Sequence, residues 1–527
     1  MIALLTAASV IAVSSAYSAE LTKVPAEAVA TVKEAVTPSH VSDTVVPKAQ
    51  RSNVLVLLFD DMRFDSFSYR GGPVPTPNID ALAAHSTQFN TAMATVGLCS
   101  PARATLFTGE WGNRTGLDDN VQLWHSRLNE MNPNQSTIID QAVKDGYFVG
   151  FVGKWHLGAL GPIKRGAQYV KIYEGDAEPN IRMYTPYDDA KAIEGYKEGK
   201  TDANGEKWQY YHTLPGTYED TDTAEKVRDG VAFLKEAATD KRPFFGVISF
   251  TQPHPPYRNP EPYASMFDPA KIVEPANFLS KDANKPLSQR EAYWPWHDVS
   301  HMSESDWRKA QAHYYGSIAM LDRAVGDIIA AAKAAGVWDN LRVIFTSDQG
   351  SMMGEHGLYD KAPYAYDELM RIPLLIRDPN IKPRVVTRHV STIDLEPTMA
   401  KWMGLKADGP VDGKSLIPLM EQGDSAVADK DDLATYDYEW YNGAWFGLRA
   451  IRTPDYKFVW NPGDSIDELY DLKKDPGEMT NQIKNPAYAS VLKDLRERLV
   501  VELQKRDDAS AKTLQAQYPE ETKVAAH

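Results

Sequence analysis

Uninterrupted apolar runs that end in polar residues recur along this chain. Six apolar residues, Val54 to Phe59, precede Asp60 and Asp61 without alternation, as is typical of a strand buried on both faces of a parallel sheet. Three later runs end in the same way, at Lys154 and His156 in "GYFVGFVGKWHLG", at His254 in "RPFFGVISFTQPHPPY", and at Asp348 and Gln349 in "LRVIFTSDQG". Because ligands bind beyond the carboxyl ends of such strands, the pattern predicts one shared site.

Helical segments such as "HYYGSIAMLDRAVGDIIAAAKAAGV" separate these runs, and the pattern changes after about residue 405. There "LRAIRTPDYKFVW" and "DELYDL" indicate antiparallel strands, and "NPAYASVLKDLRERLVVELQKRDD" indicates an amphipathic helix. The predicted fold class is α/β, with a large mixed, mostly parallel sheet sandwiched by helices and a smaller α+β subdomain. We place the catalytic domain at residues 51–405 and the antiparallel-sheet and helix subdomain at 406–527.

The first residues, "MIALLTAASVIAVSSAYSAE", are apolar and then small and polar. They predict a signal peptide over residues 1–19, cleaved after Ala16 or Ala19, and a secreted or periplasmic protein. The alternative is a disordered N-terminus, because the usual basic start is missing. Residues 20–50 predict an arm or linker. No later run of about 18 apolar residues follows, so we expect no membrane span.

The charge of the chain limits its partners. Lysine and arginine number 57 against 72 aspartates and glutamates, a net charge of −15. This balance argues against nucleic acid as a partner, since duplex-binding proteins are normally basic. An anion must therefore be bound by local cations that overcome the field of the whole chain.

The single cysteine of the chain, Cys99, stands in "CSPARATLFTG". Pro101 is placed where a helix can begin, so residue 99 is expected to face free backbone N–H groups, and Arg103 adds a guanidinium suited to oxyanions. The residues thus predict an anion site beside Cys99. Two other interpretations stay open: a small buried apolar residue, and a thiolate nucleophile paired with a histidine.

The segment Cys99-Ser100-Pro101-Ala102-Arg103 resembles the C-x-P-x-R signature of type I sulfatases, in the alkaline phosphatase superfamily. The family's Asp pair stands before this segment, at Asp60 and Asp61, and "GKWHLG", "QPHPPY", "SDQG" and a downstream lysine follow it in order. The resemblance extends to "ELYDLKKDPGEMTN". It implies that a maturation enzyme oxidises Cys99 to formylglycine. One hydroxyl of the hydrated aldehyde would attack sulfur and displace the alcohol. Deprotonation of the other would restore the aldehyde and release sulfate.

Four of the residues at the strand ends offer only oxygen ligands: Asp60, Asp61, Asp348 and Gln349. Three carboxylates and an amide suit a hard divalent cation, Ca²⁺ in the first place and Mg²⁺ as the alternative. The resembled family holds its metal at the matching positions, although asparagine is common where this chain has Gln349.

The resemblance also implies roles for the basic residues. Lys154 would contact sulfate and the diol, and His156 would assist deprotonation of the diol. His254 and Lys361 would hold sulfate and protonate the leaving oxygen, and Arg103 would add positive field.

Further candidates lie outside these motifs. His356, in "GEHGLYDK", is either a supporting or leaving-group residue or a histidine that packs a loop. We interpret residues 160–222 and 258–308 as insertions around the site. They hold four candidates for a sugar subsite: Arg182, Trp294, Trp296 and His301.

The expected function is hydrolysis of O-sulfate esters. The expected substrate is a sulfated carbohydrate or polysaccharide, with aryl sulfates as artificial substrates. One alternative is a phosphonate monoester or phosphodiester hydrolase of the same superfamily. The other is a non-catalytic anion-binding protein.

Overall fold

The computed structural model describes residues 51–121, 128–158, 161–172, 210–282, 284–290, 299–300, 302–441 and 444–519. The predicted signal peptide (1–19) and arm (20–50) lie outside the described residues. The described helices include none that is long and apolar enough to cross a membrane.

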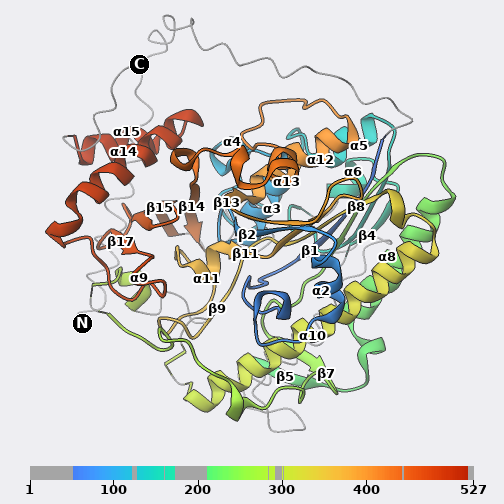
Figure 1. Ribbon diagram of the computed structural model, residues 1–527, viewed down its shortest axis with the longest axis horizontal. Coiled ribbons are helices and arrows are strands. Elements are labelled where there is room, and N and C mark those ends of the chain that lie inside the picture. Colours follow the sequence, from blue (N-terminus) through green and yellow to red (C-terminus); the bar gives the residue numbers. More distant parts are fainter. Residues whose placement is uncertain are drawn as a thin grey trace, which may run out of the picture. The chain divides into compact units, whose positions relative to one another are not determined.

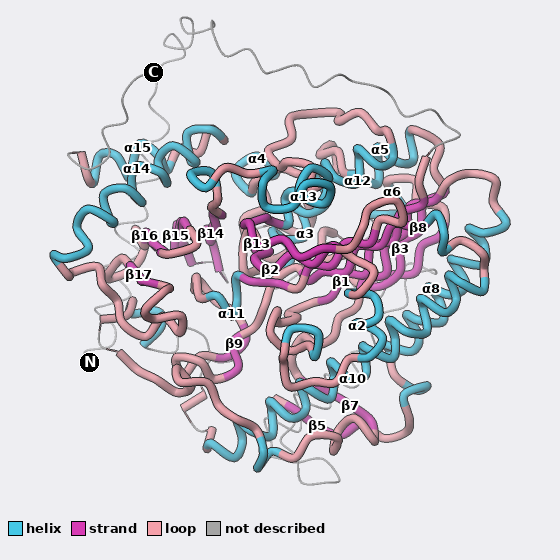
Figure 2. Tube along the Cα trace, in the orientation of Figure 1, coloured by secondary structure: helices cyan, strands magenta, loops and turns pink. Residues whose placement is uncertain are grey.

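A mixed sheet forms the centre of the larger domain (Figures 1 and 2). Within the described residues its strands run in the order β11-β2-β12-β8-β1-β6-β3-β4, and β13 pairs with β2. Five ladders are parallel, β1–β6, β1–β8, β3–β4, β3–β6 and β13–β2, while β12 and β11 add antiparallel ladders. The strands are β1 (Asn53–Phe59), β2 (Thr87–Met93), β3 (Phe148–Gly153), β4 (Tyr169–Ile172), β6 (Phe244–Ser249), β8 (Leu341–Ser347), β11 (Arg371–Ile372), β12 (Leu374–Arg377) and β13 (Arg384–Ser391). The predicted mixed, mostly parallel sheet is confirmed.

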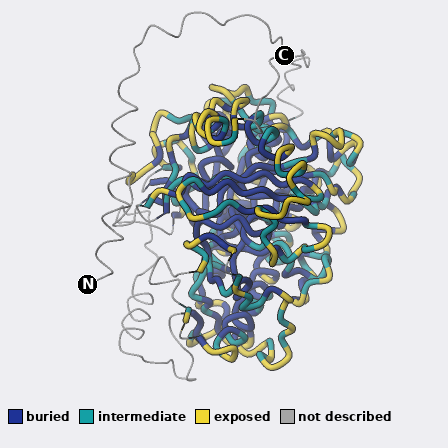
Figure 3. Tube along the Cα trace, turned by 90° about the vertical axis from the view of Figure 1, so that its left-hand side faces the viewer, coloured by how far each residue is buried: buried dark blue, intermediate teal, exposed yellow. Residues whose placement is uncertain are grey.

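Helices cover both faces of this sheet, which explains the absence of alternation in β1. Leu55, Leu57 and Phe59 pack on one side, towards α2 (Pro77–Ala83), α8 (Asp222–Thr239) and α10 (Glu304–Ala334). Val54 and Val56 pack on the other side, towards α3 (Cys99–Thr108), α5 (Ile138–Lys144), α12 (Leu395–Met403) and α13 (Ile417–Gln422). The strands lie between these two apolar layers, and exposed residues gather on the outer loops and helices (Figure 3). A strand buried on both faces needs apolar residues at every position.

The C-terminal part forms a second sheet, in the order β14-β15-β16-β17, all antiparallel. Its strands are β14 (Ala434–Tyr441), β15 (Ala444–Arg452), β16 (Tyr456–Trp460) and β17 (Glu468–Asp471). One face packs on α14 (Ala489–Lys505) and α15 (Ser510–Gln517) through residues such as Ile451 and Leu499. The opposite face carries Tyr436 and Tyr438 against Leu98 and Ala102. The predicted α+β fold of this part of the chain is confirmed, and its tyrosine face packs against the segment that holds Cys99.

Shorter elements join these layers. They are β5 (Tyr211–Leu214), which pairs with β7 (Tyr257–Pro260), β9 (Met352–Met353), which pairs with β10 (Tyr359–Asp360), and the helices α4 (Gly112–Thr115), α6 (Gly161–Lys164), α9 (Leu287–Arg290) and α11 (Asp367–Met370).

Helix α3 begins earlier than the sequence predicted. Cys99 is its first residue, and Pro101 is the third. Proline is tolerated there because N–H groups in the first turn of a helix have no acceptor within the helix. Cys99 is therefore held in helical backbone and does not precede the helix.

The end of β3 depends on a glycine. Gly153 has a φ of +98°, and a Cβ atom there would overlap the carbonyl oxygen of Ser249, its partner on β6. The same oxygen accepts a hydrogen bond from the N–H of Lys154 at 3.0 Å. The glycine thus lets β3 and β6 stay in contact where Lys154 leaves the sheet.

We predict that Gly153→Ala destabilises the protein more than Gly146→Ala. Gly146 has a φ of +83°, and a Cβ atom there would meet no other atom within 4 Å, so alanine adds only left-handed strain of about 1–2 kcal/mol. At position 153 the backbone must also shift. Midpoints of chemical denaturation measure the difference, and equal midpoints for the two variants would contradict the packing described.

Candidate active site

The polar residues that follow the strands meet around Cys99. The thiol is 1% exposed. Its Sγ lies 3.4 Å from Oδ1 of Asp60, after β1, and accepts a hydrogen bond from Nε2 of Gln349, after β8, at 3.2 Å. Ligand atoms of Cys99, Asp60 and His254 lie within 4.8 Å of one another. Three strand ends and the start of α3 thus share one small volume.

Three buried carboxylates form the centre of the site. Asp60, Asp61 and Asp348 are each 0% exposed, and each offers an oxygen within 4.8 Å of the others. The N–H of Asp61 donates to Oδ1 of Asp348 at 3.4 Å, and Nε2 of Gln349 donates to Oδ1 of Asp61 at 2.5 Å. Such a grouping is unfavourable unless cations or hydrogen-bond donors compensate the charges.

A different cation pairs with each carboxylate. Lys154 pairs with Asp60, and Nζ of Lys361 lies 2.6 Å from Oδ2 of Asp61. The third pair joins Nε of Arg103 to Oδ2 of Asp348, at 2.8 Å. Burial alone would raise the pKa of the Asp60 carboxyl, but the surrounding cations, Lys154 foremost, hold it well below its usual range.

Arg103 stabilises the fold as well as supplying positive charge near Cys99. Besides Asp348, its Nη1 donates to the carbonyl of Lys154 at 2.7 Å and to Oγ of Ser249 at 2.9 Å. One side chain on α3 thus holds the ends of β3, β6 and β8 together. Nothing in the local pattern of residues singled out Ser249, because its part depends on the pairing of distant strands.

The start of α3 differs from the expectation of free backbone N–H groups. The N–H of Ser100 donates to Oδ1 of Asn120 at 3.0 Å, and Pro101 has no N–H. The N–H of Ala102 donates to the carbonyl of Leu98 at 3.0 Å. These groups are therefore not available to an anion, and Asn120 is a further residue that the sequence did not point to.

The two histidines occupy different positions at the site. His156 is half-buried with a φ of 57°, and burial together with the charge of Lys154 holds its pKa well below the usual range. The side chain of His254 is 30% exposed, and its Nε2 lies 3.7 Å from Oδ2 of Asp61. Its Nδ1 lies 2.6 Å from the carbonyl of Pro255, so Nδ1 carries a proton. Burial and the charge of Lys361 lower the pKa of His254 to about 4.

The surroundings of Cys99 disfavour a thiolate. Burial, and next the negative charge of Asp60, raise the pKa of the thiol above its usual range. A protonated thiol is a poor nucleophile and a weak metal ligand. The interpretation of Cys99 as a thiolate nucleophile therefore has no support in this environment.

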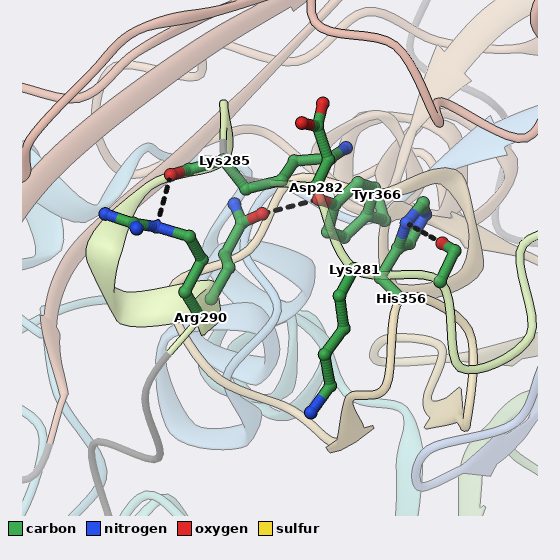
Figure 4. A pocket seen from close by; sticks show the side chains of 8 residues that line it. Lys281, Asp282, Lys285, Arg290, His356 and Tyr366 are labelled. Carbon is green, nitrogen blue, oxygen red and sulfur yellow. Dashed lines mark hydrogen bonds between the residues drawn. The ribbon is translucent and has the colours of Figure 1, made fainter.

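His356 lies apart from the carboxylates, in a cavity of about 230 Å³ (Figure 4). It sits in the turn between β9 and β10, and Lys361 follows directly after β10. Its ring stacks on Tyr366, with centroids 3.9 Å apart. Four other candidates, Arg182, Trp294, Trp296 and His301, lie outside the described residues.

Comparison with known proteins identifies the family. The family model described as Sulfatase matches residues 52–405, and that of the N-sulphoglucosamine sulphohydrolase C-terminal region matches residues 354–506. The chain belongs to the sulfatase family. This sulfatase is therefore a sulfuric ester hydrolase.

Individual relatives cover most of this sulfatase. It is 30% identical over 460 residues to the uncharacterized sulfatase YidJ of Escherichia coli, covering 86% of the chain and 87% of the relative. It is 26% identical over 522 residues to the N-acetylglucosamine-6-O-sulfatase of Bacteroides thetaiotaomicron, covering 87% of each. The solved phosphonate monoester hydrolase of Agrobacterium radiobacter has a TM-score of 0.68 and 27% identity, covering 86% of this chain and 96% of that one.

The carboxylate cluster of this sulfatase fits a hard divalent cation. Its ligand atoms are all oxygens, from Asp60, Asp61 and Asp348. Gln349 adds a buried Oε1 that accepts no hydrogen bond from any described residue. An oxygen-only set with three carboxylates is the ligand chemistry of Ca²⁺ or Mg²⁺ sites.

We predict that Arg103→Met destabilises the fold by about 3–5 kcal/mol, because it leaves the buried Asp348 carboxylate without its cation. Arg242→Met is the control. Arg242 pairs with Asp240 at 2.8 Å, but its side chain is 43% exposed, so its loss costs about 0–1 kcal/mol. Chemical denaturation measures both, and equal losses would show that the Arg103 pair does not hold the site.

Proposed function

We propose that this sulfatase hydrolyses O-sulfate esters of a sulfated carbohydrate through a hydrated formylglycine at position 99. The observation that carries the proposal is a buried thiol beside Asp60, one of three buried carboxylates that are each paired with a cation. A thiol in this setting is not itself a nucleophile. Its conversion by a maturation enzyme to an aldehyde would supply, once hydrated, one hydroxyl that attacks sulfur and a second whose deprotonation releases sulfate.

The proposed cation is Ca²⁺, with Mg²⁺ as the alternative, held by Asp60, Asp61, Asp348 and Gln349. When bound, it would neutralise negative charge and lower the pKa of a nearby hydroxyl. In the amide of Gln349, Nε2 faces the carboxylates. Rotation about the Cγ–Cδ bond would place Oε1, which has no hydrogen-bond donor among the described residues, where Nε2 now lies. Ordinary rotation of this side chain is therefore enough for it to join the ligand set.

The remaining roles follow from the positions of the chain's own groups. Lys154 and Lys361 lie beside Asp60 and Asp61, where their ammonium groups would bind the sulfate oxygens. Lys361 also pairs with Asp360, at 3.1 Å. Burial lowers the pKa of Lys361, but Asp360 and Asp61 raise it well above the usual value, so Lys361 keeps a proton for the leaving alcohol.

The histidines would act as partners of the reacting oxygens. The low pKa of His156 keeps its ring neutral, so it can accept the proton of the second hydroxyl. His254 directs Nε2 at the site while Nδ1–H is held by Pro255. Its side chain is 30% exposed, which suits a contact with the sulfate of an incoming substrate.

The carbohydrate is proposed from several observations. The N-acetylglucosamine-6-O-sulfatase relative covers 87% of this chain, and the predicted signal peptide would take the protein to the periplasm or outside the cell, where sulfated polysaccharides occur. Aryl sulfates would serve as artificial substrates. The rival function is phosphonate monoester or phosphodiester hydrolysis, which the structural match to a phosphonate monoester hydrolase favours.

Substrate choice and the nucleophile can be tested together. We predict that the matured enzyme has a higher kcat/KM for 4-nitrophenyl sulfate than for 4-nitrophenyl phenylphosphonate. Cys99→Ser should give at most one turnover, because a single hydroxyl can attack sulfur but cannot expel sulfate, and a sulfated peptide should accumulate. A preference for the phosphonate would favour the rival function, and sustained turnover by Cys99→Ser would refute the aldehyde mechanism.

The metal ligands can be tested without activity. We predict that Asp61→Asn lowers the bound calcium at least tenfold, because an amide replaces a charged ligand. Lys361 keeps Asp360 as a partner in this variant, so the fold should survive. Elemental analysis after dialysis against calcium measures the effect, with the exposed Asp268→Asn as the control. Calcium equal to that of the unchanged protein would mean that the ligands are elsewhere.

A further inference from the structure

The cavity that holds His356 has no part in the chemistry proposed above. Two segments form it, residues 280–290 and the region from the β9–β10 turn to α11, as the close view shows (Figure 4). Its lining consists of Ser280, Lys281, Asp282, Lys285, Gln289, Arg290, His356 and Tyr366. We refer to this cavity as the Arg290 pocket.

Side-chain contacts fix the aromatic floor of the Arg290 pocket. The ring of Tyr366 lies between His356, stacked at 3.9 Å, and Nζ of Lys285, at 4.7 Å from its centroid. The hydroxyl of Tyr366 donates to Oε1 of Gln289 at 2.5 Å. Lys285 is itself fixed by the hydroxyl of Tyr470, at 2.7 Å. These contacts hold the side chains of the floor in place before any ligand binds.

Two cations of the pocket have no carboxylate partner among the described residues: Lys281 and Arg290. Nε of Arg290 donates to the carbonyl of Lys285 at 3.1 Å, which fixes the side chain but does not neutralise it. The Cε atom of Lys281 lies 3.5 Å from the place of a Cβ on Gly357, so the lysine follows the turn beside His356. Asp282 is the one acidic residue of the lining, and its Oδ1 accepts the N–H of Asn284 at 2.9 Å.

Cations without a carboxylate partner in the described part of the chain are notable, because the whole chain has a net charge of −15. An anion attracted here must be recognised locally, against the field of the whole protein. The pocket combines such cations with polar groups on a preformed aromatic floor: the Oγ of Ser280 lies 3.4 Å from Nδ1 of His356. Aromatic surface with a few convergent polar groups is the usual make-up of a ligand pocket.

The Arg290 pocket is tied to the active site by the β9–β10 hairpin. Met352 pairs with Asp360 at the base of the hairpin, and Lys361 follows that base. His356 lies at the other end, in the turn, where its N–H donates to the carbonyl of Asn277 at 2.8 Å. The two ends are five residues apart, which is at most about 18 Å along an extended chain. A substrate longer than one sugar unit has the size to reach from one site to the other.

We propose that the Arg290 pocket binds an anionic substituent, a sulfate or a carboxylate, on a sugar unit next to the one that is desulfated. This inference rests on the proposed function and extends it, since it makes the preferred substrate a polyanionic oligosaccharide. Lys281 and Arg290 supply the charge, and the Tyr366–His356 floor shapes the pocket around the sugar. The Arg290 pocket is then a specificity site and not a catalytic one.

The test measures binding and turnover separately. Two tetrasaccharides distinguish the anions: one from carrageenan, which carries sulfate but no carboxylate, and one from hyaluronan, which carries carboxylate but no sulfate. We expect titration calorimetry on the full-length protein to show binding of at least one of the two tetrasaccharides. Its dissociation constant should be at least tenfold higher for the double variant Lys281→Ala/Arg290→Ala. Kinetics on 4-nitrophenyl sulfate should stay within twofold, because that substrate does not reach the pocket.

The charge-conserving pair Lys281→Arg/Arg290→Lys is the matched control and should bind within threefold of the unchanged protein. Added salt should weaken binding by the unchanged protein more than by the double alanine variant. If neither tetrasaccharide binds the unchanged protein, or the double alanine variant binds as well, the inference is overturned. If binding depends on the pair but no sulfate ester is hydrolysed, the proposed function fails and the pocket stands.

Discussion

The burial of three carboxylates side by side is the constraint on which the rest of this structure depends. An isolated buried carboxylate is too costly for a fold of ordinary stability, and removal of one partner from a buried ion pair costs about 3–5 kcal/mol. Here each carboxylate has its own cation, in the pairs Asp60–Lys154, Asp61–Lys361 and Arg103–Asp348. Burial and the charge of Asp60 nevertheless raise the pKa of Asp348 to about 8, so the balance of charge is narrow and depends on every strand end being in place.

That balance links the active site to the architecture. The cations come from α3, from the end of β3 and from the segment after β10, while the carboxylates follow β1 and β8. Arg103 reaches three strand ends, and the tyrosine face of the C-terminal sheet packs against Leu98 and Ala102 on either side of Cys99. The thiol is held by elements from both parts of the chain, which fixes its position, and its burial raises its pKa. Both properties suit a residue that is to be modified before it acts.

Much of this could be predicted from the sequence because two-sided burial leaves a clear pattern. The run from Val54 to Phe59 identified β1, and the polar residues after four such runs identified the strand ends. The places where prediction failed depend on contacts between distant segments. Proline at the third position of α3 concealed the true start of the helix at Cys99, and the N–H of Ser100 is satisfied by Asn120, twenty residues away. The assignment of His356 to a separate pocket depends on residues 280–290, which no local pattern connects to it.

The central claim is that residue 99 acts as an aldehyde, and peptide mass spectrometry on protein from its natural host, with activity measured on the same sample, tests it most directly. We predict that the peptide spanning residue 99 has the mass expected when CHO replaces CH₂SH, that it reacts with a hydrazide, and that the specific activity of each preparation rises with the aldehyde fraction. A preparation that hydrolyses sulfate esters at full rate with an intact thiol at position 99 would contradict the account.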